Sequence, residues 1–206
     1  MTSTLVPALF GLATGLSLII AIGSQNAFVL RLGIEGRNRV IAPVVAICAL
    51  SDAVLIVAGS LGLGVLVEAA PVALIVIRVI GAGFLIVYGL FAARRAFRPA
   101  VLIVSDGGRT GLAAGMTTAL ALTWLNPHVY LDTVVFLGSV ANQQGADERW
   151  WWVGGAVAAS VFWFSALGFG ARLLRPVFAK PVAWRILDGA IAVVMIGLGV
   201  KIAVGG

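Results

Sequence analysis

The residues of this chain best suited to chemistry lie close together inside a long apolar stretch, roughly 112–138. They are Asn126, His128 and Asp132, with Pro127 among them. A proline nitrogen cannot donate a hydrogen bond and its ring clashes with the carbonyl one turn earlier, so a helix here should break near Asn126. Within a membrane, a broken helix is tolerated only where it is buried in protein or lines a watered cavity. We therefore predict a polar site at this break.

Composition places the chain in a lipid bilayer. Hydrophobic residues make up 61% of the 206 residues and charged residues 11%, whereas a soluble domain carries about 25% charged residues. The net charge of +6 would suit a nucleic-acid binder, but the basic residues sit mostly in short loops and form no basic face interleaved with aromatic residues. We predict an integral membrane protein with no nucleic-acid partner.

Six apolar runs are each long enough to cross about 30 Å of hydrocarbon as a helix. No alternation typical of strands competes with them, so the predicted fold is all-α, a single transmembrane domain over residues 1–206. The runs cover about 5–30, 41–66, 71–92, 112–138, 151–171 and 184–204.

The loops between these runs indicate an orientation. The odd-numbered loops carry nearly all of the basic residues, whereas the other side has Arg149 and Lys201 beside acidic residues. Basic loops stay in the cytoplasm, so both termini are predicted outside. The basic residues of the odd loops are Arg31, Arg37, Arg39, Arg94, Arg95, Arg98, Arg109, Arg172, Arg175, Lys180 and Arg185.

The two halves of the chain resemble each other. The motif at 11–15 returns 100 residues later at 111–115, and Asn26 meets Asn126 at the same offset. Chance matching in an apolar alphabet is the alternative. Three spans per repeat would place the second copy upside down, an arrangement that recurs in secondary transporters with broken helices. The predicted parts are repeat one at about 5–92, a cytoplasmic linker at about 93–110 and repeat two at about 111–204, with the first and fourth spans broken.

The first break is predicted at Gly23, and Gln25 and Asn26 follow it directly. Opposed breaks would present helix ends, carbonyls and amides to the carboxylate and ammonium of an amino acid. Gln25, Asn26 and Asn126 are therefore candidate binding residues. The alternative is that the two asparagines only form hydrogen bonds between helices. Their pairing across the repeats favours the site.

Three charges lie well inside predicted spans, Asp52, Arg78 and Asp132, while Asp188 lies near the start of the sixth span. A charge at the bilayer centre costs about 2.5–3.5 kcal/mol, so each needs a partner or a function. We expect Arg78 to pair with Asp52, because their spans are joined by a very short loop. Asp132 would then face a cationic substrate or a proton. The alternative for the pair is a static bridge that fixes helix packing.

The remaining polar residues have two interpretations each. His128 would relay protons or donate to a nearby carbonyl, and Tyr130 would line a pocket or merely pack. Asp188, close to Arg185, would extend to the cytoplasmic surface. The run Trp150–Trp152 is typical of an interfacial aromatic anchor.

Three stretches resemble the bacterial lysine/arginine exporter family, the LysE type with its ArgO-like members. They are Gly23–Leu30 (GSQNAFVL), Ser51–Asp52 and Thr123–Thr133 (TWLNPHVYLDT). The resemblance implies a protein of the bacterial cytoplasmic membrane that exports basic L-amino acids, driven by an ion gradient. Ser24 departs from the proline common at that place in the family, which puts the geometry of the first break in doubt.

The expected function is therefore export of arginine, lysine or both by proton antiport, with alternating access around a midplane site. Asn26, Gln25 and Asn126 would bind the amino-acid ends, and Asp132, alone or with Asp52, would neutralise the cationic side chain. An exporter of neutral amino acids or other small solutes on the same fold is the alternative.

Other classes find little support in the sequence. The chain has one cysteine, one histidine, no HExxH and no nucleophile elbow, and no phosphate-binding loop is present. We expect no enzyme activity, no cofactor and no metal. Small-residue faces such as 59–64 would pack internally or against a second copy in a homodimer.

Overall fold

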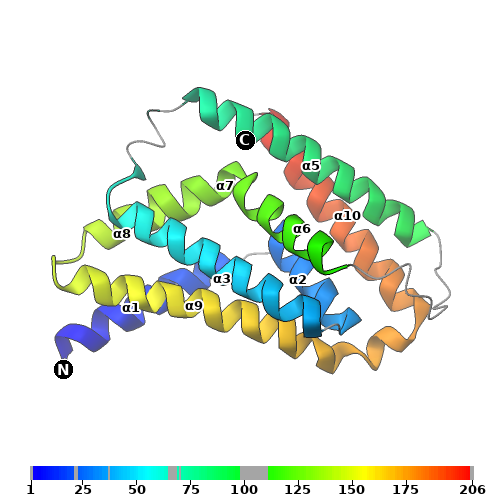
Figure 1. The fold of residues 1–206 in the computed structure, drawn as a ribbon, viewed down its shortest axis with the longest axis horizontal. Helices are drawn as coiled ribbons and strands as arrows, with labels where there is room; N and C mark the ends of the chain where they lie inside the picture. Colours follow the sequence, from blue (N-terminus) through cyan, green and yellow to red (C-terminus); the bar gives the residue numbers. More distant parts are fainter. Residues whose placement is uncertain are drawn as a thin grey trace.

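The computed structural model describes residues 2–20, 23–36, 38–64, 69, 71–97 and 111–204. Every regular element in these ranges is a helix, which confirms the all-α prediction (Figure 1). Four helices are long and apolar enough to cross a membrane. They are α3 (Asn38–Ser60), α5 (Pro71–Phe97), α9 (Glu148–Gly170) and α10 (Pro181–Val204).

The first predicted span is two helices rather than one. α1 (Thr2–Ile19) and α2 (Ser24–Glu35) are bent by 85° relative to each other, and together they pass as a fifth span. α2 begins after Gly23, whose backbone is extended, and ends at Gly36, whose φ of 74° is the left-handed conformation that glycine adopts easily. The predicted break at Gly23 is confirmed.

The fourth predicted span is also interrupted. α6 (Leu112–Trp124) ends before Asn126, and Pro127 then takes the first position of α7 (Pro127–Val129), where its missing N–H costs nothing. The chain continues as a π-helix, η2 (Tyr130–Leu137), and ends in α8 (Gly138–Asn142). The break near Asn126 is confirmed. π-Helical turns are rare and occur frequently at functional sites.

The helices pair in a definite way. α1 lies along α9 and α5 lies along α10, while α3 packs on α9 and on the second interrupted segment (Figure 1). α5 runs through Phe97, so the start of the predicted linker is helical, and its residues 98–110 lie outside the described ones. Of the predicted small-residue face, Gly59 packs inside the chain against the Val134 carbonyl.

Backbones of α1 and α9 touch directly. A Cβ added at Gly155 would overlap the carbonyl oxygen of Ala8, and one at Gly11 would overlap that of Trp152. Membrane helices gain packing energy from such close approach, because burying apolar side chains gains little where the solvent is itself apolar.

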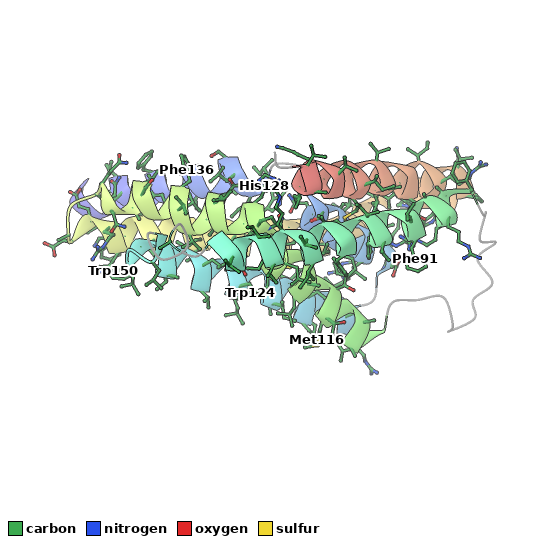
Figure 2. The ribbon with its side chains drawn as sticks, turned by 90° about the horizontal axis from the view of Figure 1, so that it is seen from above. Phe91, Met116, Trp124, His128, Phe136 and Trp150 are labelled. Atoms are coloured by element: carbon green, nitrogen blue, oxygen red, sulfur yellow. The ribbon has the colours of Figure 1, made fainter. Side chains whose placement is uncertain are left out.

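The outward surface is apolar, as a bilayer requires. Large side chains such as Leu5, Val79, Phe162 and Val193 are exposed, and Figure 2 shows side chains extending from the helices on all sides. The predicted aromatic anchor is only partly right. Trp150 and Trp151 are exposed at one end of the molecule, but Trp152 is fully buried because the turn of α9 directs it into the core.

We predict that Gly155→Ala lowers the thermal stability of the detergent-purified protein. The added methyl group would overlap the Ala8 carbonyl, and overpacking of this kind costs about 1–3 kcal/mol. Gly154→Ala is the matched control, since a Cβ there meets nothing within 4 Å. Equal unfolding temperatures for the two variants would contradict the close packing of α1 on α9.

Candidate functional site

A buried acid joins α3 to α9. Asp52 lies in the middle of α3, and its Oδ2 accepts a hydrogen bond of 2.7 Å from the hydroxyl of Ser160 in α9. One turn earlier on α3, the buried thiol of Cys48 contacts the side chain of Gln25, in the first turn of α2. Asp52 therefore lies where α2, α3 and α9 meet.

The first helix break is tied to α9 by Asn26. Its Nδ2 donates to the carbonyl of Ile19 at 2.6 Å, and its Oδ1 accepts from Nε1 of Trp163 at 3.2 Å. The Ile19 carbonyl belongs to the last turn of α1, where the break leaves it without a partner from its own helix. Asn26 thus holds the broken backbone in place.

The second break is tied to α3. Asn126 caps α7, because its Oδ1 accepts from the backbone N–H of His128 at 3.1 Å. The hydroxyl of Tyr130 donates to the carbonyl of Trp124 at 2.8 Å, and Nε1 of Trp124 donates to the hydroxyl of Ser51 at 3.1 Å. Trp124 and His128 lie near the middle of the long axis of the molecule (Figure 2).

These contacts form one group, which we call the central polar cluster. Ser51 of α3 is bonded to the second break, and its neighbour Asp52 is bonded to α9, the helix that also holds the first break through Trp163. Ser24 Oγ and Gln25 Nε2 are buried beside the first break without a hydrogen-bond partner among the described residues, so they offer groups to a ligand. The cluster comprises Ser24, Gln25, Asn26, Cys48, Ser51, Asp52, Trp124, Asn126, Tyr130, Ser160 and Trp163.

The expected pair of Asp52 with Arg78 is wrong. Arg78 donates from Nε to the carbonyl of Ile202 near the end of α10, whereas Asp52 bonds to Ser160. The reason is the helix pairing: α5 packs along α10, so neighbours in sequence are not neighbours in the fold.

Asp132 and His128 differ from Asp52 in their exposure. Asp132 is exposed on η2, and His128 is half-buried on α7, while Asp52 is buried between α3 and α9. Within the described ranges the structure gives Asp132 no ion pair.

The prediction for Asp188 is also wrong. Its side chain is buried and accepts from Arg31 of α2 and Arg95 of α5, while Arg185 donates instead to the carbonyl of Ala96. Sequence reasoning missed this cluster. The available signal was the spacing of Arg31 and Glu35, four residues apart on one helix face.

An apolar helical fold with two interrupted spans around a buried polar cluster is typical of secondary transporters. In the described part of the chain, no three His, Cys, Asp or Glu side chains gather to hold a metal. A family model for LysE type translocators matches residues 16–206. The chain belongs to this family, as its motifs indicated.

Curated relatives cover nearly the whole chain. "Putative amino-acid transporter Rv0488" of Mycobacterium tuberculosis is 50% identical over 189 residues, 92% of either chain. The lysine exporter LysE of Corynebacterium diphtheriae is 35% identical, covering 91% of this chain and 94% of its own. The arginine exporter ArgO of Serratia proteamaculans is 40% identical over 94% of each. No solved structure gives a significant match.

We predict that Tyr130→Phe destabilises the protein by about 1 kcal/mol, because the half-buried Trp124 carbonyl loses its donor. The measurement is the unfolding temperature in detergent. Tyr88→Phe is the control, since the described residues give the Tyr88 hydroxyl no hydrogen bond while its ring packs on Phe28. Equal stability of both variants would exclude the proposed tie across the break.

Proposed function

We propose that this chain is a secondary active exporter of basic L-amino acids, arginine or lysine, that works by proton antiport across the bacterial cytoplasmic membrane. The observation that carries the proposal is the buried Asp52, which joins α3 to α9, the two helices to which the helix breaks are tied. Relatives named as lysine and arginine exporters support the substrate class. They also agree with a transport role rather than an enzymatic one.

The helix pairing supports two inverted repeats. If a two-fold axis in the membrane plane relates the repeats, the first span of each repeat can pack on the second span of the other repeat. The third spans of the two repeats then pack on each other. α1 packs on α9, the second interrupted segment packs on α3, and α5 packs on α10. Asp52 and Ser160 are separated by 108 residues, the offset that also relates Gly81 to Gly189. Their hydrogen bond would therefore lie on the axis.

Energetics favours coupling to protons. Moving a positive charge outward against an inside-negative potential costs about 2.3 kcal/mol per 100 mV. Exchange of one cationic amino acid for one inward proton moves no net charge, so the potential no longer opposes export. Asp52 would carry that proton, because it is a buried acid whose carboxylate accepts from the neutral hydroxyl of Ser160 rather than from a cation.

The substrate would lie at the breaks. The N-terminus of α2, with Ser24 and Gln25, would bind the carboxylate, and groups around Asn126 and Tyr130 would hold the ammonium. Asp132 would receive the cationic side chain, with His128 nearby as a second proton carrier. Asn26 and Asn126 would keep both breaks in shape while the substrate passes.

The membrane setting follows from the basic loops. The cytoplasmic side would hold the ends of α2 and α5 and the start of α10, with both termini outside. The coupling ion, the lipid bilayer and the basic amino acid are then the partners of this protein.

We predict that Asp52→Asn separates exchange from coupling. In proteoliposomes, exchange of labelled arginine for unlabelled arginine should persist, because it needs no net proton movement. Arginine movement driven by a pH gradient should be lost, because asparagine cannot carry a proton. Asp147→Asn, an exposed acid beside α9, is the control and should keep both activities. Intact coupling in the Asp52 variant would exclude Asp52 as the proton carrier.

We predict that Asp132→Asn abolishes the preference for basic substrates. Vesicles loaded with arginine, lysine, threonine or leucine would be tested for uptake of labelled arginine, and the wild-type protein should respond only to the two basic amino acids. Loss of the carboxylate removes the attraction for a cation. If threonine and leucine exchange equally well in the wild-type protein, the alternative of a neutral-solute exporter takes the place of this proposal.

A further inference from the structure

Four charged side chains from three helices meet away from the central polar cluster. We call them the arginine–acid cluster: Arg31, Glu35, Arg95 and Asp188. Arg31 donates from Nε to Glu35 Oε1 at 2.9 Å and from Nη1 to Asp188 Oδ1. Arg95 donates from Nε to the same Asp188 oxygen at 3.2 Å. Asp188 thus joins α2, α5 and α10 through one carboxylate.

The members of this cluster differ in how firmly they are held. The side chains of Arg31, Glu35 and Asp188 are 14%, 13% and 6% exposed, whereas that of Arg95 is 37% exposed. Arg31 makes two ion pairs and Arg95 makes one. Of the two arginines, Arg95 therefore loses fewer ion pairs when it leaves the cluster.

The place that Arg95 occupies is built for a cation. Its guanidinium lies 5.8 Å from the centre of the Tyr88 ring, a distance suited to cation–π attraction. Glu35 Oε2 is buried with no hydrogen-bond partner among the described residues, so an acceptor is available beside Asp188. Without Arg95 the remaining side chains carry two negative charges and one positive charge. The net charge of the cluster is then −1, which one bound cation would balance.

The group held there is chemically the same as the proposed substrate. Arg95 presents a guanidinium to an aspartate and an aromatic ring, as a bound arginine would, and a lysine carries the same charge. Arg31 is shared between Glu35 and Asp188, so Arg31 alone leaves two largely buried carboxylates with one cation. Buried carboxylates are costly when their charge is not balanced, so a second cation is needed at Asp188 whether the substrate is bound or not. An arginine of the protein's own chain meets this need between substrates.

We propose that the arginine–acid cluster is a second binding site for the cationic side chain of the substrate, in which Arg95 holds the place that the substrate takes. The inference rests on the proposed function and adds to it a site at the end of α5 and the start of α10. The incoming cation binds Asp188 Oδ1 and the Tyr88 ring and donates to Glu35 Oε2, while Arg95 turns out to solvent. Release of Arg95 also frees α5 from its ion pair with α10.

A single introduced cysteine tests this site directly. Arg95→Cys places a thiol at the vacated position, and the natural Cys48 is buried and should not react. The purified protein in detergent would be treated with the cationic reagent aminoethyl methanethiosulfonate or the anionic sulfonatoethyl reagent. Arg94→Cys is the matched control, because Arg94 is the neighbouring residue on α5 and is exposed.

We expect the cationic reagent to modify Arg95→Cys faster than the anionic reagent does. The ratio of the two rates should be at least about tenfold higher for Arg95→Cys than for Arg94→Cys, because the Asp188 carboxylate lies beside position 95 and the cluster without Arg95 has a net negative charge. Arginine should slow the reaction of Arg95→Cys and leucine should not, while neither changes the reaction of the control. As a second measurement, Arg95→Gln should bind arginine more tightly in calorimetry, because the competing group is gone.

Absence of arginine protection in Arg95→Cys, in a protein that exchanges arginine and lysine in vesicles, would overturn the second site and leave the proposed function standing. The cluster would then be a static link between helices. Failure of the wild-type protein to exchange any basic amino acid would instead overturn the proposed function, and with it the substrate named for this site. Weaker arginine binding by Arg95→Gln would also count against the site, since it would make Arg95 a ligand rather than a competitor.

Discussion

The structure depends on supplying hydrogen bonds to backbone that a membrane leaves without water. Each helix break releases carbonyl groups in a region where an unsatisfied group costs several kcal/mol. The protein meets this need locally: Asn26 donates to the Ile19 carbonyl, and Tyr130 donates to that of Trp124. Two tryptophans then bond each break to an uninterrupted helix. Trp163 of α9 donates to Asn26 at the first break, and Trp124 at the second break donates to Ser51 of α3. The breaks are thereby fixed features of the fold.

This constraint explains how much the sequence could predict. The positions of both breaks followed from local chemistry, because proline and glycine act on their own helix whatever surrounds it. The all-helical class followed from composition. The roles of Asn26 and Asn126 were less accessible. Each side chain was expected to face a ligand, with hydrogen bonding between helices as the alternative. Each is engaged with its own break, and Asn26 also bonds to Trp163 of α9. A side chain that repairs the backbone and one that binds a substrate look alike in a sequence.

The partners of the charged residues could not be predicted from the sequence, for a different reason. The expected pair of Asp52 with Arg78 assumed that consecutive spans pack together, whereas α5 leaves α3 and packs on α10. Asp188 was placed at the surface because a basic residue stood near it in the chain, yet its partners Arg31 and Arg95 come from helices distant in sequence. Local rules locate breaks, but ion pairs between helices depend on the global arrangement of the spans.

The direct contact of α1 with α9 also limits how this protein can move. Where side chains separate two helices, one can slide past the other by small rotamer changes, but at Gly11 and Gly155 backbone meets backbone and no such layer exists. Shear between the two is therefore blocked, and they travel as one rigid body. The first turn of α2 is bonded to the same body by Asn26, through the Ile19 carbonyl of α1 and Nε1 of Trp163 in α9, so it moves with that body.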